Sequence, residues 1–207
     1  MNLRLWLLLS VFVLPLFVSL DTSAVWDSNE AFYVQTPREM LANSDWLVPR
    51  FNGQARLNKP PLSYWLVATL YSLFGVSVFW ERLLTAVCGL ASVLAVLQLG
   101  RQLFSVRIAV LAAGILATTF RFLILSRRGL IEVLLLALLL WALVFLLQWS
   151  RSTRPVFLYA ASLLLALAFL TKGPLVLLVP SIFSVFLGIS GRRKLLLSPN
   201  LAPALLL

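Results

Sequence analysis

Residues 130–147 read LIEVLLLALLLWALVFLL, an apolar run in which Glu132 is the one charged residue. A helix needs about 20 residues to cross the hydrocarbon core of a bilayer, and a run of this kind is typical of a membrane span. Similar runs precede and follow it. We therefore predict spans over residues 3–20, 83–99, 106–120, 129–148, 156–170 and 173–190.

The composition supports the same class of protein. Hydrophobic residues make up 61% of the 207 residues and charged residues only 12%, whereas soluble domains are nearer half apolar and a quarter charged. The net charge of +10 comes from Lys and Arg in short clusters between apolar runs. Such clusters typically flank membrane spans, and they do not form the basic stripe of a nucleic-acid-binding surface. We predict an all-α integral membrane protein, a multi-pass helical bundle of about six spans, with no nucleic acid partner.

Two segments are open to more than one interpretation. Residues 3–20 fit a retained first helix, or a cleaved signal peptide because small residues follow it. Residues 62–79 mix apolar, aromatic and hydroxyl side chains, which favours an interfacial or re-entrant helix over a span. With six spans, the basic loops around Arg101, Arg151 and Arg192 share the side of Arg4, and all seven acids face the other side. This segregation favours a cytoplasmic N-terminus.

Residues 21–61 form the longest polar stretch. We interpret residues 21–80 as a large first extracytoplasmic loop with short juxtamembrane helices. One helix is expected to start near Ser28, with Pro37 breaking or restarting it. The loop holds five of the seven acidic residues, Asp21, Asp27, Glu30, Glu39 and Asp45. Its central part, residues 26–65, reads WDSNEAFYVQTPREMLANSDWLVPRFNGQARLNKPPLSYW.

This stretch resembles the first extracytoplasmic loop of GT-C membrane glycosyltransferases, in the branch of aminoarabinose transferases and protein mannosyltransferases. The family pattern has an acidic pair, a Tyr, an Arg-Glu-Met-Leu run and a Lys-Pro-Pro. The sequence supplies Glu30, Tyr33, Arg38-Glu39-Met40-Leu41, Asp45-Trp46, Pro49-Arg50-Phe51-Asn52-Gly53 and Lys59-Pro60-Pro61. Weaker similarity continues through Arg82 and the later spans. Family members are usually longer, so residues 1–207 would be the N-terminal part of that architecture, or a truncated, inactive product.

The resemblance implies sugar transfer from a polyprenyl-phosphate donor to a lipid, glycan or protein acceptor at the periplasmic face of the bacterial inner membrane. In the family an acidic residue activates the acceptor and cations hold the lipid phosphate. The first acid of the family pair falls here on Asn29, an amide that cannot take a proton. Glu30 or Asp27 would then be the catalytic acid. The same two residues also fit a helix cap, with Asp27 as the N-cap.

The chemistry of the residues agrees with these roles. A carboxylate can accept the proton of an attacking hydroxyl, and a cation eases the departure of a phosphate. Lys59 suits the second task because two prolines stiffen the chain after it. Tyr33 and Arg82 are further candidates for binding the lipid phosphate, although Arg82 is also interpretable as an ordinary flanking charge.

Two more sites of interest lie at the ends of later spans. Glu132 begins a long apolar run, where a charge costs energy and is a candidate for catalysis; alternatively it pairs with Arg128 four residues earlier. Arg128 is also a candidate phosphate contact. Lys172 precedes Gly173 and Pro174 at a tight corner, as in the family, where it would contact phosphate or extend to the interfacial water.

Other partners and cofactors are weakly constrained. Cys88 is the only cysteine and there is no histidine, which excludes an intrachain disulfide and a His/Cys metal site. The sequence requires no cofactor, although a divalent metal bridging carboxylates and phosphate is chemically reasonable. A partner subunit is not identifiable. The rival function is a transporter or flippase-like protein for a lipid-linked solute, although transporters usually place their charges at mid-membrane.

Overall fold

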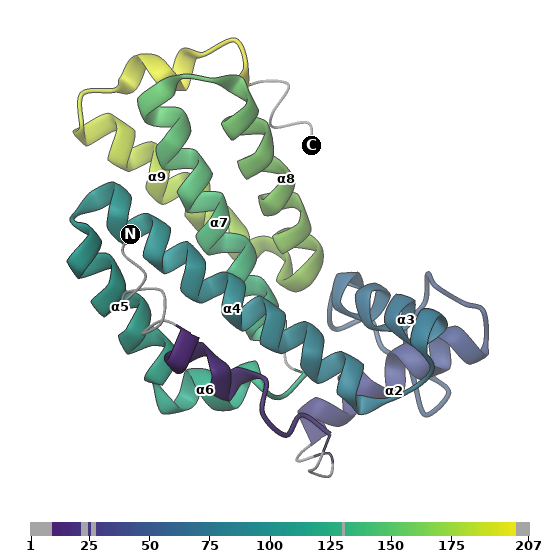
Figure 1. Ribbon diagram of the computed structural model, residues 1–207. Helices are drawn as coiled ribbons and strands as arrows, with labels where there is room; N and C mark the ends of the chain where they lie inside the picture. Colours follow the sequence, from purple (N-terminus) through teal and green to yellow (C-terminus); the bar gives the residue numbers. More distant parts are fainter. Residues whose placement is uncertain (1–9, 22–24, 26–27, 130, 202–207) are drawn as a thin grey trace.

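The computed structural model describes residues 10–21, 25, 28–129 and 131–201, and this part of the chain is helical apart from one short hairpin (Figure 1). The fold class predicted from the sequence is therefore confirmed. The strands β1 (Arg50–Phe51) and β2 (Gln54–Ala55) pair antiparallel. The helices are η1 (Leu14–Leu16), α2 (Ser28–Ala42), α3 (Leu62–Phe74), α4 (Val78–Leu103), α5 (Val106–Thr118), α6 (Phe120–Ser126), α7 (Ile131–Ser152), α8 (Pro155–Lys172), η2 (Gly173–Leu177), α9 (Leu178–Ile189) and η3 (Arg193–Leu197).

Several of these helices have the dimensions of membrane spans. At about 1.5 Å per residue, the 26 residues of α4 and the 22 of α7 exceed the roughly 30 Å of a bilayer core. Within the described residues, three stretches are long and apolar enough to cross a membrane, or four if the bent pair α5 and α6 counts as one. The total of about six spans remains a prediction, and part of the predicted first span lies outside the described residues.

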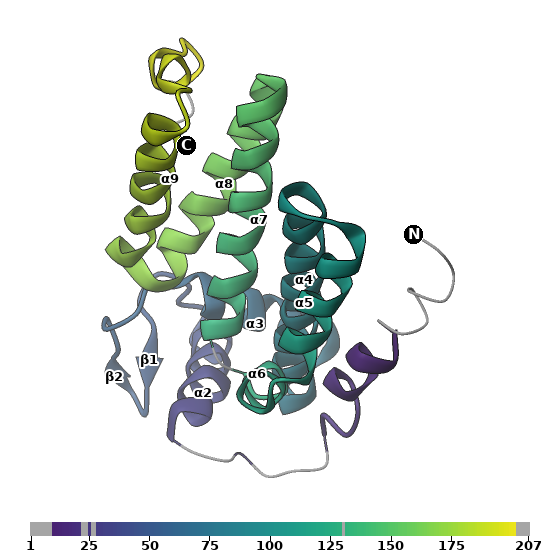
Figure 2. The same cartoon turned by 90° about the vertical axis from the view of Figure 1, so that its left-hand side faces the viewer.

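The third of these stretches, Pro155–Ile189, contains a reversal of the chain. Gly173 has a φ of +76°, a conformation that glycine adopts without steric cost, and it ends α8. Leu158 near the start of α8 and Leu187 near the end of α9 belong to one hydrophobic cluster, so the two helices run in opposite directions (Figure 2). The predicted corner between residues 170 and 173 is therefore confirmed.

The start of α4 differs from the prediction. Ser77 caps the helix by accepting a hydrogen bond from the amide of Phe79 at 3.2 Å, so α4 begins at Val78 and not at residue 83. A serine N-cap of this kind satisfies a backbone amide that would otherwise lack a partner. Glu81 and Arg82 consequently lie inside the helix and are not charges that precede it.

The predicted span 106–120 is also interrupted. α5 ends at Thr118 and α6 leaves it at an angle of 67°. Thr119 has an extended backbone, and its hydroxyl donates to the carbonyl of Ile115 at 2.7 Å. Hydroxyls that bind nearby carbonyls compete with helix continuation, and two adjacent threonines do so here. The short helix α6 therefore turns away from α5 and packs against the first half of α4, where Ser126 lies against Gly89 and Phe122 shares a cluster with Ala86.

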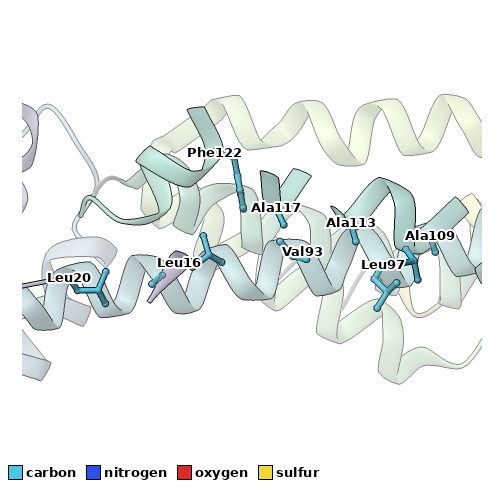
Figure 3. Packing of buried hydrophobic residues seen from close by; sticks show 10 residues of the cluster. Leu16, Leu20, Val93, Leu97, Ala109, Ala113, Ala117 and Phe122 are labelled. Carbon is cyan, nitrogen blue, oxygen red and sulfur yellow. The ribbon is translucent and has the colours of Figure 1, made fainter. Parts of the chain in front are cut away.

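Small residues let α4 and α5 approach closely, as is common between membrane helices. Ala109, Ala113 and Ala117 of α5 face Val93 and Leu97 of α4, and all five are buried (Figure 3). A Cβ added at Gly100 would lie 2.6 Å from the Cα of Ala109. The contact therefore depends on the absence of a side chain at position 100.

A second layer of short elements lies at one end of the long helices (Figures 1 and 2). It consists of α2, α3 and the β1–β2 hairpin. The 13 residues of α3 span about 20 Å, too short for a bilayer crossing. The expectation that Pro37 breaks or restarts the helix that begins near Ser28 is wrong, because α2 continues through Pro37 to Ala42. Pro37 lacks the N–H of one helical hydrogen bond, but Tyr33 and Met40 on either side are held by packing against Tyr64 and Ile131.

Candidate active site

A buried ion pair joins the first loop to the long helices. Arg82 Nε of α4 donates to Glu30 Oε1 of α2 at 2.7 Å, and the two side chains are only 2% and 1% exposed. Arg82 Nη1 also donates to the carbonyl of Leu20 at 2.9 Å. A buried charge requires such a partner. Three segments distant in sequence are thus fixed around two of the predicted site residues, whereas Asp27 lies outside the described residues.

A second ion pair joins Glu132 and Lys172, the two candidate residues at the ends of later spans. Lys172 Nζ at the end of α8 lies 3.2 Å from Glu132 Oε1 in the first turn of α7. Glu132 is 46% exposed, so this pair is accessible to solvent and adds little to stability. Its importance is positional, because Glu132 and Lys172 stand side by side although 40 residues separate them.

Tyr33 shares a helix with Glu30 of the first ion pair and packs against the residue next to Glu132 of the second. It lies on α2 one turn after Glu30, stacks on Tyr64 with ring centroids 5.7 Å apart, and packs in one cluster with Ile131, the neighbour of Glu132. Burial raises the pKa of Tyr33 well above its ordinary value, and the nearby Tyr64 and Glu132 raise it further. Tyr33 is therefore a neutral phenol at physiological pH, able to donate a hydrogen bond.

The hairpin that precedes Lys59 is docked on α2. Glu39 accepts hydrogen bonds from the amides of Asn52 at 2.8 Å and Gly53 at 3.1 Å. Burial raises the pKa of Glu39, but hydrogen bonds from Gln35, Gly53 and Asn52 outweigh it and the net pKa is lowered. Lys59 itself is partly exposed, and it forms no ion pair with a carboxylate in the described part of the chain.

Sequence reasoning missed Glu81, the acid beside Arg82. Glu81 is 1% exposed, and neither carboxylate oxygen has a hydrogen-bond partner among the described residues. It lines a cavity of about 20 Å³, room for about one water, together with Tyr33, Ser63, Thr85 and Gly129. The available signal was Ser77, since a cap there places Glu81 inside the helix, where a charge is expensive.

The residues next to Glu81 and Gly129 line a different cavity. This second cavity, of about 320 Å³, is here called the arginine pocket. It is lined by Ser19, Arg82, Phe120, Leu123, Ile124, Arg127 and Arg128. The start of α4 and the turn at residues 127–129 therefore form a wall with a carboxylate on one side and guanidinium groups on the other. Arg82 and Arg128, both predicted to bind phosphate, line the arginine pocket, and Glu132 is not among the described residues that line it.

No metal centre is recognisable from side chains alone. Across residues 10–21, 25, 28–129 and 131–201, no three His, Cys, Asp or Glu side chains form a group that could hold an ion. A divalent metal shared with a substrate phosphate stays a prediction.

Known proteins resemble this chain in sequence. Several relatives carry the name undecaprenyl phosphate-alpha-4-amino-4-deoxy-L-arabinose arabinosyl transferase. The relative from Aeromonas salmonicida (strain A449) is 31% identical over 200 residues, which cover 93% of this chain and 36% of the relative. Transferase 1 of Sodalis glossinidius (strain morsitans) is 37% identical over 191 residues, covering 86% and 33%. An uncharacterized protein of Aquifex aeolicus (strain VF5) is 34% identical over 171 residues, covering 80% and 33%. The chain thus spans about a third of the length of the curated relatives it matches.

Two crystal structures of ArnT from Cupriavidus metallidurans share the fold. The apo state aligns with a TM-score of 0.79 and the state bound to undecaprenyl phosphate with 0.84, each at 24% identity. The alignments cover 98% of this chain and 40% and 39% of the respective structures. Together with the helical bundle, they show that this is an integral membrane protein.

The family resemblance drawn from the first loop is confirmed by a match that starts within that loop and extends far beyond it. Residues 58–207 match the family model described as dolichyl-phosphate-mannose-protein mannosyltransferase. Because this match covers more than half of the chain, the chain belongs to the dolichyl-phosphate-mannose-protein mannosyltransferase family.

Proposed function

We propose that this chain is the membrane region of a glycosyltransferase, which moves a sugar from a polyprenyl-phosphate donor to a lipid, glycan or protein acceptor. The observation that carries the proposal is the convergence of the first loop, the head of α7 and the end of α8 around Tyr33, with Glu132 and Lys172 exposed there. The names of the Aeromonas and Sodalis relatives support it, as does the ArnT structure that contains undecaprenyl phosphate. These transferase names do not favour the transport alternative.

The carboxylates have different parts in this proposal. Glu132 is solvent-accessible and beside a cation, so it accepts the proton of the acceptor hydroxyl as that oxygen attacks the sugar. Glu30 is engaged by the buried guanidinium of Arg82, so it holds the loop in place and stands second as a proton acceptor. Asp27 stays a candidate on the basis of sequence alone.

The cations hold lipid phosphate. Lys59 and Lys172 neutralise the charge that develops on the donor phosphate as the sugar leaves, and Tyr33 is a neutral hydrogen-bond donor to it. Arg82 and Arg128 are phosphate-binding candidates in the neighbouring arginine pocket. The reaction is placed at the periplasmic face of the bacterial inner membrane, because the seven acids were predicted to share one side and the basic loops the other.

Binding of undecaprenyl phosphate to the purified chain in nanodiscs tests the proposal without requiring turnover. Lys59→Ala and Lys172→Ala each remove a charged hydrogen bond, worth about 1.5–3 kcal/mol, so retention should fall by tenfold or more. Lys194→Ala, an exposed lysine after α9, is the matched control and should bind normally. Native mass spectrometry of the ejected complexes measures retention.

Transfer is then measured in membranes supplied with a labelled polyprenyl-phosphate sugar. Glu132→Gln keeps the size of the side chain and removes the proton acceptor, so it should slow transfer on the order of 10²-fold while donor retention is unchanged. Equal retention by the wild type and both lysine variants would reject the proposed phosphate site. Full transfer by Glu132→Gln would reject the proposed base.

A further inference from the structure

The arginine pocket has the composition of a site for an amphiphile. Its polar lining comes from Ser19 and three arginines, and its apolar lining from α6 (Phe120, Leu123 and Ile124). Among the described residues, no carboxylate lines it. Its volume of about 320 Å³ lies at the lower end of the range typical of small-molecule sites. One wall is suited to an anion and the opposite wall to hydrocarbon.

The positive charge of this pocket is only partly balanced. Glu30 compensates Arg82 at 2.7 Å. Arg127 is anchored differently, because its Nη2 donates to the carbonyl of Val18 at 2.6 Å while its buried Nε has no hydrogen-bond partner in the part of the chain that the structure describes. No ion pair joins Arg127 to a carboxylate within the described residues. A guanidinium held in place with its charge uncompensated favours a phosphate ligand.

The surroundings indicate where such a phosphate would come from. Phe120 is 77% exposed at the bend between α5 and α6, and Ile115 of α5 is similarly exposed. Leu14 and Val18 of the N-terminal segment are exposed as well. In a membrane protein, exposed apolar side chains of this kind face acyl chains. The pocket is therefore flanked by surface that suits the tails of the molecule whose head group it would hold.

We propose that the arginine pocket binds the phosphate of an anionic phospholipid, at a site separate from the donor site around Glu132 and Lys172. The separation rests on the lining of the pocket, because neither Glu132 nor Lys172 is among the described residues that line it. Arg127, Arg128 and Ser19 bind the head group, and the acyl chains lie along α6. This inference depends on the membrane location of the chain and not on the proposed sugar transfer.

The test uses the whole chain in nanodiscs of phosphatidylcholine containing a minor fraction of phosphatidylglycerol. The double variant Arg127→Gln/Arg128→Gln is compared with Arg107→Gln/Arg154→Gln, which removes two exposed arginines elsewhere. Native mass spectrometry counts retained phosphatidylglycerol. The wild type and the control should retain it, and the pocket variant should weaken retention roughly thirty-fold, about fivefold for each arginine lost. Arg127→Lys keeps the charge and should retain most of the binding.

Three results would overturn the proposal. The first is equal retention by the pocket variant and the control, with both folded as judged by circular dichroism. The second is that inorganic phosphate binds the pocket and phosphatidylglycerol does not, which would make a soluble anion the ligand. The third is loss of phosphatidylglycerol in Lys59→Ala or Lys172→Ala, which would merge the two sites. Failure of these lysine variants to affect undecaprenyl phosphate would count against the proposed function alone.

Discussion

Gly129 is the position at which the wall between the two cavities is most sensitive to a small change. A Cβ at this residue would overlap Oε1, Cδ and Cγ of Glu81. We predict that Gly129→Ala destabilises the protein by displacing the Glu81 side chain. We further predict that Glu81→Ala relieves most of this loss, because it removes the atoms that collide with the new methyl group.

The size of the effect follows from the geometry. Ordinary contact begins near 3.4 Å, so the carboxylate must move away from the new methyl group, and the adjoining space of about 20 Å³ holds little more than a water. Overpacking of a buried site costs about 1–3 kcal/mol. With Glu81→Ala the same methyl group fits, and reduced freedom of the unfolded chain contributes about 0.4–1 kcal/mol of stability. The unfolded-chain contribution is the same in both backgrounds, so the coupling between the two substitutions should equal the overpacking cost of about 1–3 kcal/mol.

A double-mutant cycle measures this coupling. The four proteins are unfolded in mixed micelles by a denaturing detergent, followed by far-ultraviolet circular dichroism. Gly188→Ala in α9 is the matched control, since a Cβ there meets no atom within 4 Å, and it should leave stability unchanged or raise it slightly. Additivity of the two substitutions to within about 0.5 kcal/mol would refute the contact between Gly129 and Glu81.

Three further perturbations test other parts of the structure. Arg82→Gln should cost about 3–5 kcal/mol, because it leaves the carboxylate of Glu30 buried without its partner; the same unfolding assay measures it. The pKa of Glu39 is lower in the folded protein than its unfolded value near 4.5, so the ionised carboxylate stabilises the docked hairpin at pH values above 4.5. This stabilisation is lost as the pH falls through the pKa of the folded state. The protection factor of the Asn52 amide in hydrogen exchange should therefore fall in acid, and Glu39→Gln should abolish this acid dependence. Gly100→Ala should cost about 1–3 kcal/mol by forcing α4 and α5 apart, seen as a lower melting temperature.

The sequence predicts the membrane helices well because burial in a bilayer depends on composition more than on tertiary contacts. The run 130–147 was identifiable as a membrane helix without knowledge of what packs against it, and α7 occupies Ile131–Ser152. Boundaries were less predictable, since local capping determines them: Ser77 moved the start of α4, and Thr119 ended α5. Pro37 misled because tertiary packing around α2 outweighed a local preference.

The candidate site was only partly predictable for a different reason. Glu30, Tyr33, Glu132 and Lys172 were recognisable as residue types at motif positions, and the fold brings the segments that carry them together. Their partners were not predictable, because the pairs Glu30–Arg82 and Glu132–Lys172 join residues 52 and 40 positions apart. Glu81 was missed since its unusual property, burial without a hydrogen-bond partner, exists only once α4 is packed.

Two adjacent residues of opposite charge at the start of α4 line different cavities: Glu81 lines the small cavity and Arg82 lines the arginine pocket. Consecutive residues of a helix point about 100° apart, so Glu81 and Arg82 face different spaces although they are neighbours in sequence. Arg128 and Gly129 repeat this division from the other side, because Arg128 lines the arginine pocket while Gly129 lies against the Glu81 carboxylate. Unlike charges at low dielectric attract strongly, and if Glu81 paired with these arginines it would cancel the positive charge available to a phosphate. Keeping the acid behind the glycine leaves the pocket cationic, which is the property that its proposed lipid ligand requires.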